Sequence, residues 1–192
     1  YWRLLEKHGD PKILWPQWCA KNKDERLREI VAVGAFLTQR TSWHNADLAL
    51  RNLKREGFLS LKKLANLTDL STLRELIKPA GFYQTKPQRL MNFAQFVTGE
   101  YRSLTRLKKE GLDGIRSRLL KLYGVGPETA DTILLYSLDK PSFVIDEYTK
   151  RFVQKENLTQ NFAYSDLKNL FEKNLSQDTE IYQNYHILII VD

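Results

Sequence analysis

The chain is poor in the features that mark secreted or membrane-spanning proteins. Cys19 is its one cysteine among 192 residues, which excludes a disulfide scaffold and any cysteine-ligated metal cluster within this sequence. The longest apolar run, 187–191, has five residues, whereas a membrane span needs roughly 20. The sequence begins Tyr-Trp-Arg, without a recognisable signal peptide. We therefore expect a cytoplasmic protein that binds no membrane.

Acidic residues are in the minority, and this imbalance points to an anionic partner. The sequence has 30 Lys and Arg residues against 23 Asp and Glu residues, which gives a net charge of +7. Such an excess favours nucleic acid before other anionic partners. Hydrophobic residues make up 42% of the chain, enough to bury a core. A wholly disordered chain is therefore excluded, and one domain or two small lobes are expected.

Turn-forming residues are sparse, and between them apolar residues recur at intervals of three and four. Stripes such as Ile30, Val33 and Leu37 favour amphipathic helices over strands. The run 143–145 is the one short strand-like segment. The pattern predicts an all-α protein with about ten helices. Because an apolar run ends just before Asp192, we expect the chain to be cut within or just after a helix.

The most informative motif is the glycine-rich stretch 119–131, Leu-Leu-Lys-Leu-Tyr-Gly-Val-Gly-Pro-Glu-Thr-Ala-Asp. We expect a helix to end near Tyr123, and Gly124 and Gly126 to permit backbone angles and close approaches that a side chain would block. Pro127 suits the first turn of the following helix. Free backbone N–H groups at such a hairpin can hold a phosphate and so position DNA without reading its sequence. The plainer interpretation is a turn with a glycine C-cap.

The segment 119–151 resembles the helix-hairpin-helix plus Gly/Pro-Asp signature of the endonuclease III superfamily of DNA glycosylases. The segments 34–41, 78–86 and 185–189 are similar to that family in the same order along the chain. The resemblance implies a two-lobed all-α fold with the DNA groove and the base pocket between the lobes. It divides the chain into residues 1–30, which belong with the C-terminal helices, a central lobe 31–140 with the hairpin at about 115–138, and a catalytic segment with C-terminal helices, 141–192.

One departure from the family pattern bears on the chemistry. Bifunctional members carry a nucleophilic lysine two residues after the second hairpin glycine, where this chain has Glu128. A carboxylate cannot form the Schiff base that drives β-elimination. The resemblance therefore implies a monofunctional, monomeric enzyme that acts on a damaged base in double-stranded DNA. Within the family the chain looks most like the bacterial 3-methyladenine glycosylases of the endonuclease III type.

Asp146, directly after the apolar run 143–145, is the candidate catalytic residue. Cleavage of an N-glycosidic bond builds positive charge on the sugar, and a carboxylate near C1′ stabilises that charge and can orient or deprotonate the attacking water. An alkylated purine is already cationic and leaves readily, so a carboxylate and a pocket suffice. The alternative role for Asp146 is to cap a helix that begins near Glu147, and the two roles are compatible.

Trp15, Pro16 and Trp43 are the candidate base-pocket residues. A flipped base must be held by stacking, and an electron-poor cationic base stacks well on an electron-rich indole. The resemblance implies that Trp15 and Pro16 form one side of the pocket and that Trp43 stacks on the base. The alternative is that these tryptophans belong to the core, as in most small helical proteins. Trp2 and Trp18 receive no role.

The remaining candidates contact DNA. By resemblance, Gln39 and Phe82 fill the gap that a flipped base leaves, and both lie in turns, where inserting residues are usually presented. The alternative for Phe82 is a buried aromatic side chain at a helix start. The candidate phosphate-binding residues are Lys121, Gly124, Val125, Gly126 and Thr129, and the further cations near these motifs are Lys86, Arg89, Lys150 and Arg151.

No metal or cofactor site is expected within these residues. His8, His44 and His186 lack the mutual spacing of metal ligands, and Cys19 is interpreted as a buried apolar residue. Many members of the family that the chain resembles carry a four-cysteine [4Fe–4S] loop directly after the helix that ends here. Such a cluster requires the natural chain to continue past Asp192.

Three other functions stay open at this point. The first is a bifunctional glycosylase/lyase for oxidised pyrimidines that uses a lysine from elsewhere, and Glu128 argues against it. The second is a non-catalytic helix-hairpin-helix DNA-binding module, against which Asp146 at the family position argues. The third is a helical interaction domain with incidental charge, which predicts no salt-dependent affinity for DNA.

Overall fold

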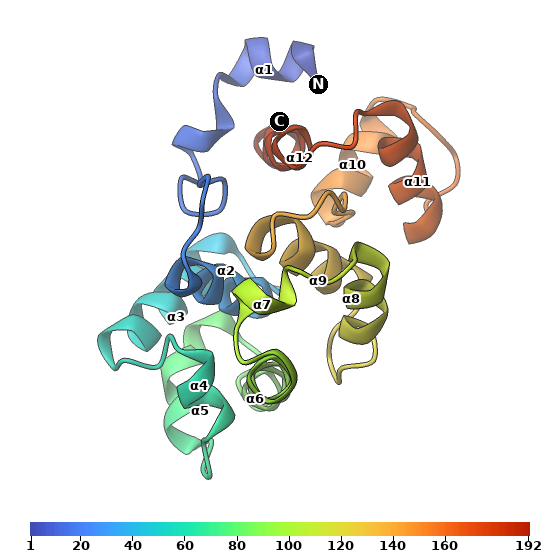
Figure 1. Cartoon of the computed structure of the whole chain (residues 1–192). Coiled ribbons are helices and arrows are strands. Elements are labelled where there is room, and N and C mark those ends of the chain that lie inside the picture. Colours follow the sequence, from blue (N-terminus) through green and yellow to red (C-terminus); the bar gives the residue numbers. More distant parts are fainter.

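The computed structural model describes residues 1–192 and confirms the all-α prediction, since it contains helices and connecting turns but no strand (Figure 1). Twelve α-helices are present rather than about ten, because short helices divide the central stretch. None of them is long and apolar enough to cross a membrane. The helices are α1 (Trp2–His8), α2 (Glu25–Leu37), α3 (Trp43–Arg55), α4 (Leu61–Ala65), α5 (Ser71–Ile77), α6 (Lys86–Phe96), α7 (Leu104–Leu107), α8 (Leu112–Leu119), α9 (Pro127–Thr132), α10 (Glu147–Lys155), α11 (Tyr164–Asn174) and α12 (Thr179–Val191), with 3-10 turns η1 (Pro11–Ile13) and η2 (Lys78–Ala80) and π-helical segments η3 (Val97–Tyr101) and η4 (Ile133–Ser137).

Local sequence explains many of the helix starts. Asp24, Ser42, Asp146 and Asp178 precede α2, α3, α10 and α12, and each side chain accepts a hydrogen bond from a backbone N–H in the first turn. These N–H groups have no partner inside the helix, so a side-chain acceptor at the N-cap stabilises the start. Pro127 takes the first position of α9, as predicted.

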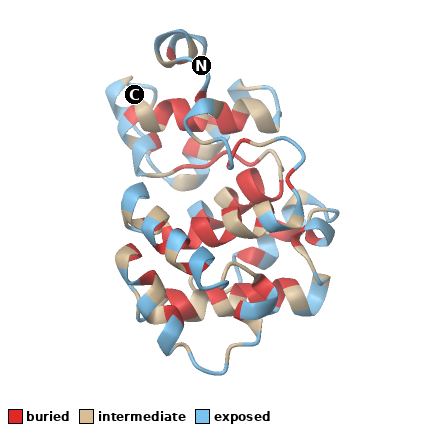
Figure 2. Cartoon of the chain, turned by 90° about the vertical axis from the view of Figure 1, so that its left-hand side faces the viewer, coloured by how far each residue is buried: buried red, intermediate tan, exposed pale blue.

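Two hydrophobic cores hold the helices together, and buried residues appear in both the upper and the lower parts of Figure 2. The larger core has 28 buried residues between α2 and Leu138, and the smaller has 17, drawn mainly from the N-terminal segment and the C-terminal helices. The cores meet in α2 and η4: Val31 and Leu135 belong to the smaller core, whereas Ala32 and Leu134 belong to the larger. Because both helices serve both cores, the lobe boundaries drawn from the sequence stay a prediction.

The glycine-rich hairpin joins α8 to α9, but its first helix ends earlier than expected, at Leu119 rather than near Tyr123. Gly124 has a φ of 80°, and a Cβ at this position would lie 2.3 Å from Cδ of Arg89. Only glycine fits there. Gly126 has a φ of −90°, and a Cβ would meet no atom within 4 Å. The fold therefore requires glycine at position 124 but not at position 126.

The apolar segment 143–145 is extended and buried, but it is not the expected strand. It has no partner strand, and side chains of α11 accept its backbone hydrogen bonds instead. The N–H of Phe143 donates to Oε1 of Glu172 at 2.8 Å, and the N–H of Ile145 donates to the Tyr164 hydroxyl at 3.5 Å. This segment leads directly to Asp146, so α11 fixes the path on which that residue lies.

We predict that Gly124→Ala destabilises the fold and that Gly126→Ala does not. Alanine at position 124 must adopt a positive φ and displace Arg89, which costs about 1–3 kcal/mol. At position 126 we expect a change within about 0.5 kcal/mol. Urea unfolding followed by circular dichroism measures both, and equal stabilities of the two variants would contradict the steric argument.

Candidate active site

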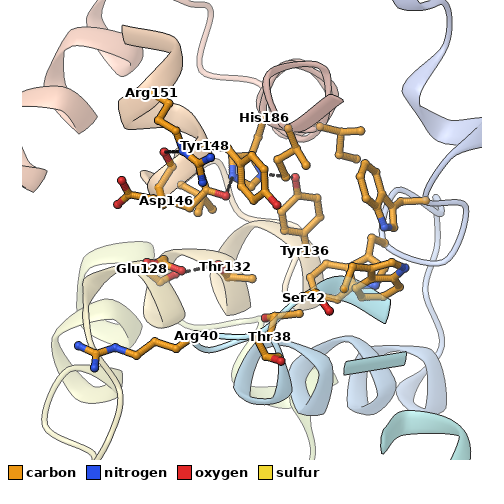
Figure 3. A pocket seen from close by; sticks show the side chains of 18 residues that line it. Thr38, Arg40, Ser42, Glu128, Thr132, Tyr136, Asp146, Tyr148, Arg151 and His186 are labelled. Carbon is orange, nitrogen blue, oxygen red and sulfur yellow. Dashed lines mark hydrogen bonds and ion pairs between the residues drawn. The ribbon is translucent and has the colours of Figure 1, made fainter. Parts of the chain in front are cut away.

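One cavity of about 740 Å³ is lined by residues from the beginning, the middle and the end of the chain (Figure 3). The turn between α2 and α3 and the helix α9 lie on one side of it, and α10 and α12 lie on the other. Its volume suits a small organic ligand. The lining comprises the aromatic residues Trp15, Trp18, Trp43, Tyr136 and Tyr148, the ionisable residues Arg40, Glu128, Asp146, Glu147, Arg151 and His186, and the smaller side chains Thr38, Thr41, Ser42, Thr132, Val144, Ile187 and Ile190.

Asp146 lies in this cavity at the start of α10, and its expected role as a helix cap is confirmed. Its Oδ1 accepts hydrogen bonds from the Thr149 backbone N–H at 2.8 Å and from the Thr149 hydroxyl at 3.0 Å. The Asp146 side chain is 16% exposed. The cap thus holds the carboxylate in a fixed orientation on the cavity wall, with a small part of its surface accessible. The catalytic role of Asp146 stays a prediction.

His186 of α12, which the sequence left unassigned, faces the Asp146 carboxylate (Figure 3). Its Nε2 lies 3.3 Å from Oδ2 of Asp146. On the other side of the ring, Nδ1 lies 2.8 Å from the Tyr136 hydroxyl, which is also 3.3 Å from the carbonyl oxygen of Gln183. Sequence reasoning missed this cluster because its members come from three helical segments that only tertiary packing brings together. The one available signal was the position of His186 inside a segment that resembles the glycosylase family.

The surroundings of Asp146 keep its carboxyl group ionised. Burial alone would raise its pKa, but the charge of His186, the contact with that ring and the hydrogen bonds from Thr149 outweigh burial and hold the pKa of Asp146 below its ordinary value. The ionised carboxylate is the form that can stabilise a developing positive charge or accept a proton from water. The cavity therefore contains a fixed negative charge at neutral pH.

Glu128 of α9 supplies a second carboxyl group to the same cavity. The side chain is exposed, yet it lines the cavity and the surrounding protein atoms reduce its hydration. This desolvation, together with the negative charge of Asp146, raises the pKa of Glu128 above its ordinary value. The two carboxyl groups thus differ: Asp146 is held ionised, and Glu128 is the more readily protonated of the two.

Two of the three predicted pocket residues line the cavity, and a tryptophan without an assigned role joins them. The rings of Trp15 and Trp43 pack edge to face with centroids 6.3 Å apart, and Trp18 packs against Trp43 at 5.6 Å. Trp18 is 9% exposed and Trp43 is 38% exposed. The buried ring of Trp18 therefore packs against the more exposed ring of Trp43. The three-residue spacing between Trp15 and Trp18 is the signal that could have found Trp18, because it places both on one face of a helical turn. Pro16 is exposed and does not line the cavity.

The two candidate gap-filling residues lie in different environments. Phe82 is 52% exposed and has a φ of 48°, which excludes the buried alternative for this side chain. Gln39 is held by three partners: its Nε2 donates to the Gly124 carbonyl at 3.1 Å and to Oγ1 of Thr129 at 2.9 Å, and its Oε1 accepts from Arg89 at 2.7 Å. These bonds tie the turn after α2 to the hairpin. Gln39 would have to leave them before it could enter a duplex.

The hairpin exposes only part of the predicted phosphate-binding set. Lys121 and Gly126 are exposed. Val125 and Thr129 are each 7% exposed, and the Thr129 hydroxyl faces Gln39 rather than solvent. A phosphate on this hairpin would therefore meet the backbone and Lys121, and not the side chain of Thr129.

Lys86 is not the phosphate contact that its position in the sequence indicated. It is fully buried, and its Nζ donates to the carbonyl oxygens of Leu37 at 2.7 Å and Ala80 at 2.8 Å. Carbonyls at helix ends lack partners within the helix, and this cation satisfies two of them. Burial lowers the pKa of Lys86 to about 8. Lys86 thus joins the ends of α2 and η2, next to the turns that carry Gln39 and Phe82.

The remaining histidines and the cysteine lie outside the cavity lining. Cys19 is buried, as predicted, and burial raises the pKa of its thiol to about 12. His8 lies beside Asp192, with its Nε2 3.1 Å from Oδ1 of that residue. No group of three or more His, Cys, Asp or Glu side chains is placed to hold a metal ion.

The hairpin between α8 and α9, with a tryptophan-lined cavity beside it, defines a helix-hairpin-helix protein. A family model described as "HhH-GPD superfamily base excision DNA repair protein" matches residues 33–177. The chain belongs to this superfamily, and it is a DNA repair glycosylase by family. A Methanocaldococcus jannaschii protein, provisionally named a DNA repair glycosylase, is 46% identical over 190 residues, which cover 97% of this chain and 82% of that protein.

Solved structures with the same fold include a DNA glycosylase and an endonuclease III–DNA complex. The 3-methyladenine DNA glycosylase MagIII of H. pylori, bound to 1,N6-ethenoadenine, has a TM-score of 0.77 and 28% identity, and the match covers 94% of this chain and 93% of that one. A non-covalent endonuclease III–DNA complex has a TM-score of 0.69 and 17% identity, with 98% of this chain and 82% of that one covered. At this low identity, the match to the endonuclease III complex shows that the two chains share a fold and nothing more.

We predict that Asp146 contributes to stability in a pH-dependent way. Its folded pKa lies below the ordinary value, so the ionised carboxylate stabilises the fold above the unfolded pKa, and this contribution is lost as pH falls through the folded pKa. Asp146→Asn keeps a capping side chain. It should be less stable than the wild-type protein at neutral pH, with a difference that shrinks in acid. Urea unfolding at several pH values measures this, and a difference that does not change with pH would contradict the assignment.

Proposed function

We propose that this protein is a monofunctional DNA glycosylase that removes an alkylated purine, such as 3-methyladenine, from double-stranded DNA. The observation that carries the proposal is an ionised carboxylate, Asp146, in a cavity lined by three tryptophans and by no lysine. The damaged base flips out of the duplex into this cavity, and water then hydrolyses the bond between the base and C1′.

The lining of the cavity suits a cationic base. An alkylated purine carries a positive charge, which favours stacking on an indole such as Trp43 and is attracted by Asp146 and Glu128. When the bond to C1′ breaks, its electron pair leaves with the base and neutralises it, while positive charge develops on the sugar. Asp146 stabilises that charge. The water oxygen forms the new bond to C1′ and passes its proton to the carboxylate or to solvent.

The side chains around the cavity support hydrolysis rather than strand cleavage. A Schiff base needs an uncharged primary amine within reach of C1′. The basic side chains that line the cavity are Arg40, Arg151 and His186, none of which is a primary amine. Glu128 stands at the start of α9, where the bifunctional enzymes that the sequence resembles carry lysine.

The hairpin supports duplex DNA as the substrate. Gly126 is exposed and immediately precedes α9, whose first N–H groups have no intrahelical partner and can bind a phosphate. Glu128 and Thr132 of the same short helix line the cavity, so a phosphate bound at the hairpin brings the DNA backbone next to the cavity. Both walls come from one chain, and we therefore propose a monomer as the active form.

The likeness to MagIII supports an alkylated adenine as the base. That enzyme is named a 3-methyladenine DNA glycosylase, and its structure holds 1,N6-ethenoadenine. Because the match covers nearly the full length of both chains at 28% identity, we include both lesions among the substrates to be tested.

A bifunctional glycosylase/lyase for oxidised pyrimidines is the alternative. Lys150 of α10 is the amine that could serve it, since its charge acts on Glu128, which lines the cavity. Lys150 does not line the cavity, and for this reason we favour the monofunctional reaction.

We predict that the protein releases 3-methyladenine from methylated DNA without cutting the strand. The duplexes to compare carry methylated purines, 1,N6-ethenoadenine or thymine glycol, with chromatography to identify the released base and gel electrophoresis to detect cleavage. Because no amine lines the cavity, borohydride should trap no covalent protein–DNA adduct.

Two other outcomes would contradict this proposal in different ways. Release of thymine glycol with strand cleavage and a borohydride-trapped adduct would establish the bifunctional alternative, and loss of the adduct in Lys150→Ala would identify the nucleophile. Salt-dependent DNA binding with no base released from any duplex would indicate a non-catalytic DNA-binding module.

We predict that substitution of Asp146 lowers the rate of base release, whereas substitution of Trp43 weakens the binding of lesion DNA. Asp146→Asn removes the charge but keeps the size, and single-turnover base release should fall about 10²–10³-fold with lesion-DNA affinity nearly retained. Trp43→Ala should weaken binding of lesion DNA by about 1–3 kcal/mol and leave binding of undamaged DNA unchanged. Trp2 is 76% exposed and lies outside the cavity, so Trp2→Ala is the matched control with no expected effect. A wild-type rate of base release in Asp146→Asn would disprove the catalytic role.

A further inference from the structure

We propose that His186 and Tyr136 form a positioning pair for the Asp146 carboxylate, a role that rests on the proposed function of Asp146. The pair acts through the carboxylate rather than on the base. It holds the second carboxylate oxygen and places a positive charge beside it, so that Asp146 remains ionised under conditions in which a buried acid would take up a proton.

The geometry gives each carboxylate oxygen its own partner. Oδ1 of Asp146 accepts two hydrogen bonds from Thr149, while Oδ2 lies 3.3 Å from Nε2 of His186. That nitrogen is buried and makes no hydrogen bond, either to Asp146 or to any other group. A buried nitrogen without a partner is costly, and the group that it faces is the carboxylate. Asp146 is therefore the acceptor that Nε2 of His186 can serve.

The hydrogen-bond partners on the other side of the imidazole ring are compatible with the protonated form of His186. Nδ1 of His186 lies 2.8 Å from the Tyr136 hydroxyl, and that hydroxyl lies 3.3 Å from the Gln183 carbonyl oxygen. In an imidazolium both ring nitrogens are donors. Nδ1–H then donates to the Tyr136 oxygen, and the Tyr136 O–H donates to Gln183, so every polar hydrogen on this side has an acceptor. The side chain of Gln183 is itself fixed by a hydrogen bond to the Leu135 carbonyl at 2.8 Å.

The neighbouring charges act on Asp146 in opposite directions. Glu128 approaches from α9 and repels a negative charge on Asp146, while His186 approaches from α12 and attracts it. Tyr136 is a neutral donor, because burial raises its pKa well above the ordinary value. The other titratable groups that face this cluster are Glu147, Tyr148, Lys150 and Arg151 of α10, Arg40 of the turn before α3, and Cys19 of the N-terminal segment.

The test compares His186→Gln with the wild-type protein in single-turnover base release across pH, using the full chain and the base that the wild-type protein releases. Glutamine can place an amide N–H near the position of Nε2, so the variant keeps a donor but loses the charge. We expect the acid limb of the rate profile to move upward by about one pH unit or more, because Asp146 becomes easier to protonate. At the acid end the rate should fall about tenfold or more, with a smaller loss on the alkaline plateau.

Further variants separate positioning from a general structural effect. Tyr136→Phe removes the acceptor for Nδ1–H and should move the same limb in the same direction by a smaller amount. His8 is the matched control, since its Nε2 lies 3.1 Å from a carboxylate oxygen of Asp192 and it does not line the cavity. His8→Gln should leave the profile unchanged. A uniform fall in rate for His186→Gln, with the acid limb in its original place, would overturn the proposal.

A readout without substrate keeps this inference distinct from the proposed function. Nitrogen-15 NMR of the histidine rings compares the Nε2 resonance of His186 in the wild-type protein and in Asp146→Asn. Replacement of the carboxylate that Nε2 faces at 3.3 Å should shift this resonance, and an unchanged resonance would disprove the pairing. If no damaged duplex yields a free base, the proposed function fails, and the NMR comparison still decides whether the two side chains are coupled.

Discussion

The arrangement of the cavity depends on one buried carboxylate, that of Asp131. It is completely buried, and it accepts hydrogen bonds from Arg116 at 2.8 and 3.0 Å, from the Ser142 hydroxyl at 2.7 Å and from the Tyr164 hydroxyl at 2.7 Å. These donors come from α8, from the segment before Asp146 and from α11. A buried carboxylate without partners costs several kcal/mol, so this arrangement is stable only when all three elements are in place. One charge thereby fixes the hairpin relative to the helices that carry the candidate catalytic residue.

The consequences of this anchor extend to both walls of the cavity. Ser142 begins the buried extended segment that ends at Asp146, so the hydrogen bond to Asp131 fixes one end of that segment and the cap on α10 fixes the other. The short helix that carries Asp131 also carries Glu128 and Thr132, which face the cavity. The hairpin and the candidate catalytic carboxylate are therefore placed by the same helix. A phosphate bound to the hairpin would lie at a set position relative to the carboxylate.

The sequence predicted those features that depend on neighbouring residues in the chain, but it did not predict the features that depend on tertiary packing. The all-α class, the cap at Asp146 and the start of α9 follow from spacing and from the chemistry of single residues, and the structure confirms them. Lys86 was taken for a surface cation because a basic residue is normally exposed, yet two helix-end carbonyls draw it into the interior. Trp18 and His186 received no role because their importance comes from neighbours far away in sequence, Trp43 and Asp146. Nothing in a single sequence reports such a pairing.

The distribution of charge explains why the carboxylate needs a cationic partner. The protein carries a net charge of +7, which attracts a polyanion, whereas the cavity is lined by three acids, Glu128, Asp146 and Glu147. Under the proposed function, DNA brings additional negative charge close to the cavity, and negative charge makes a carboxylate easier to protonate. Burial acts on Asp146 in the same direction. A glycosylase that works as proposed must therefore offset both effects at its catalytic carboxylate. Under the proposed function, His186 serves this need: its Nε2 lies 3.3 Å from Oδ2 of Asp146, on the wall of the same cavity that the tryptophans line.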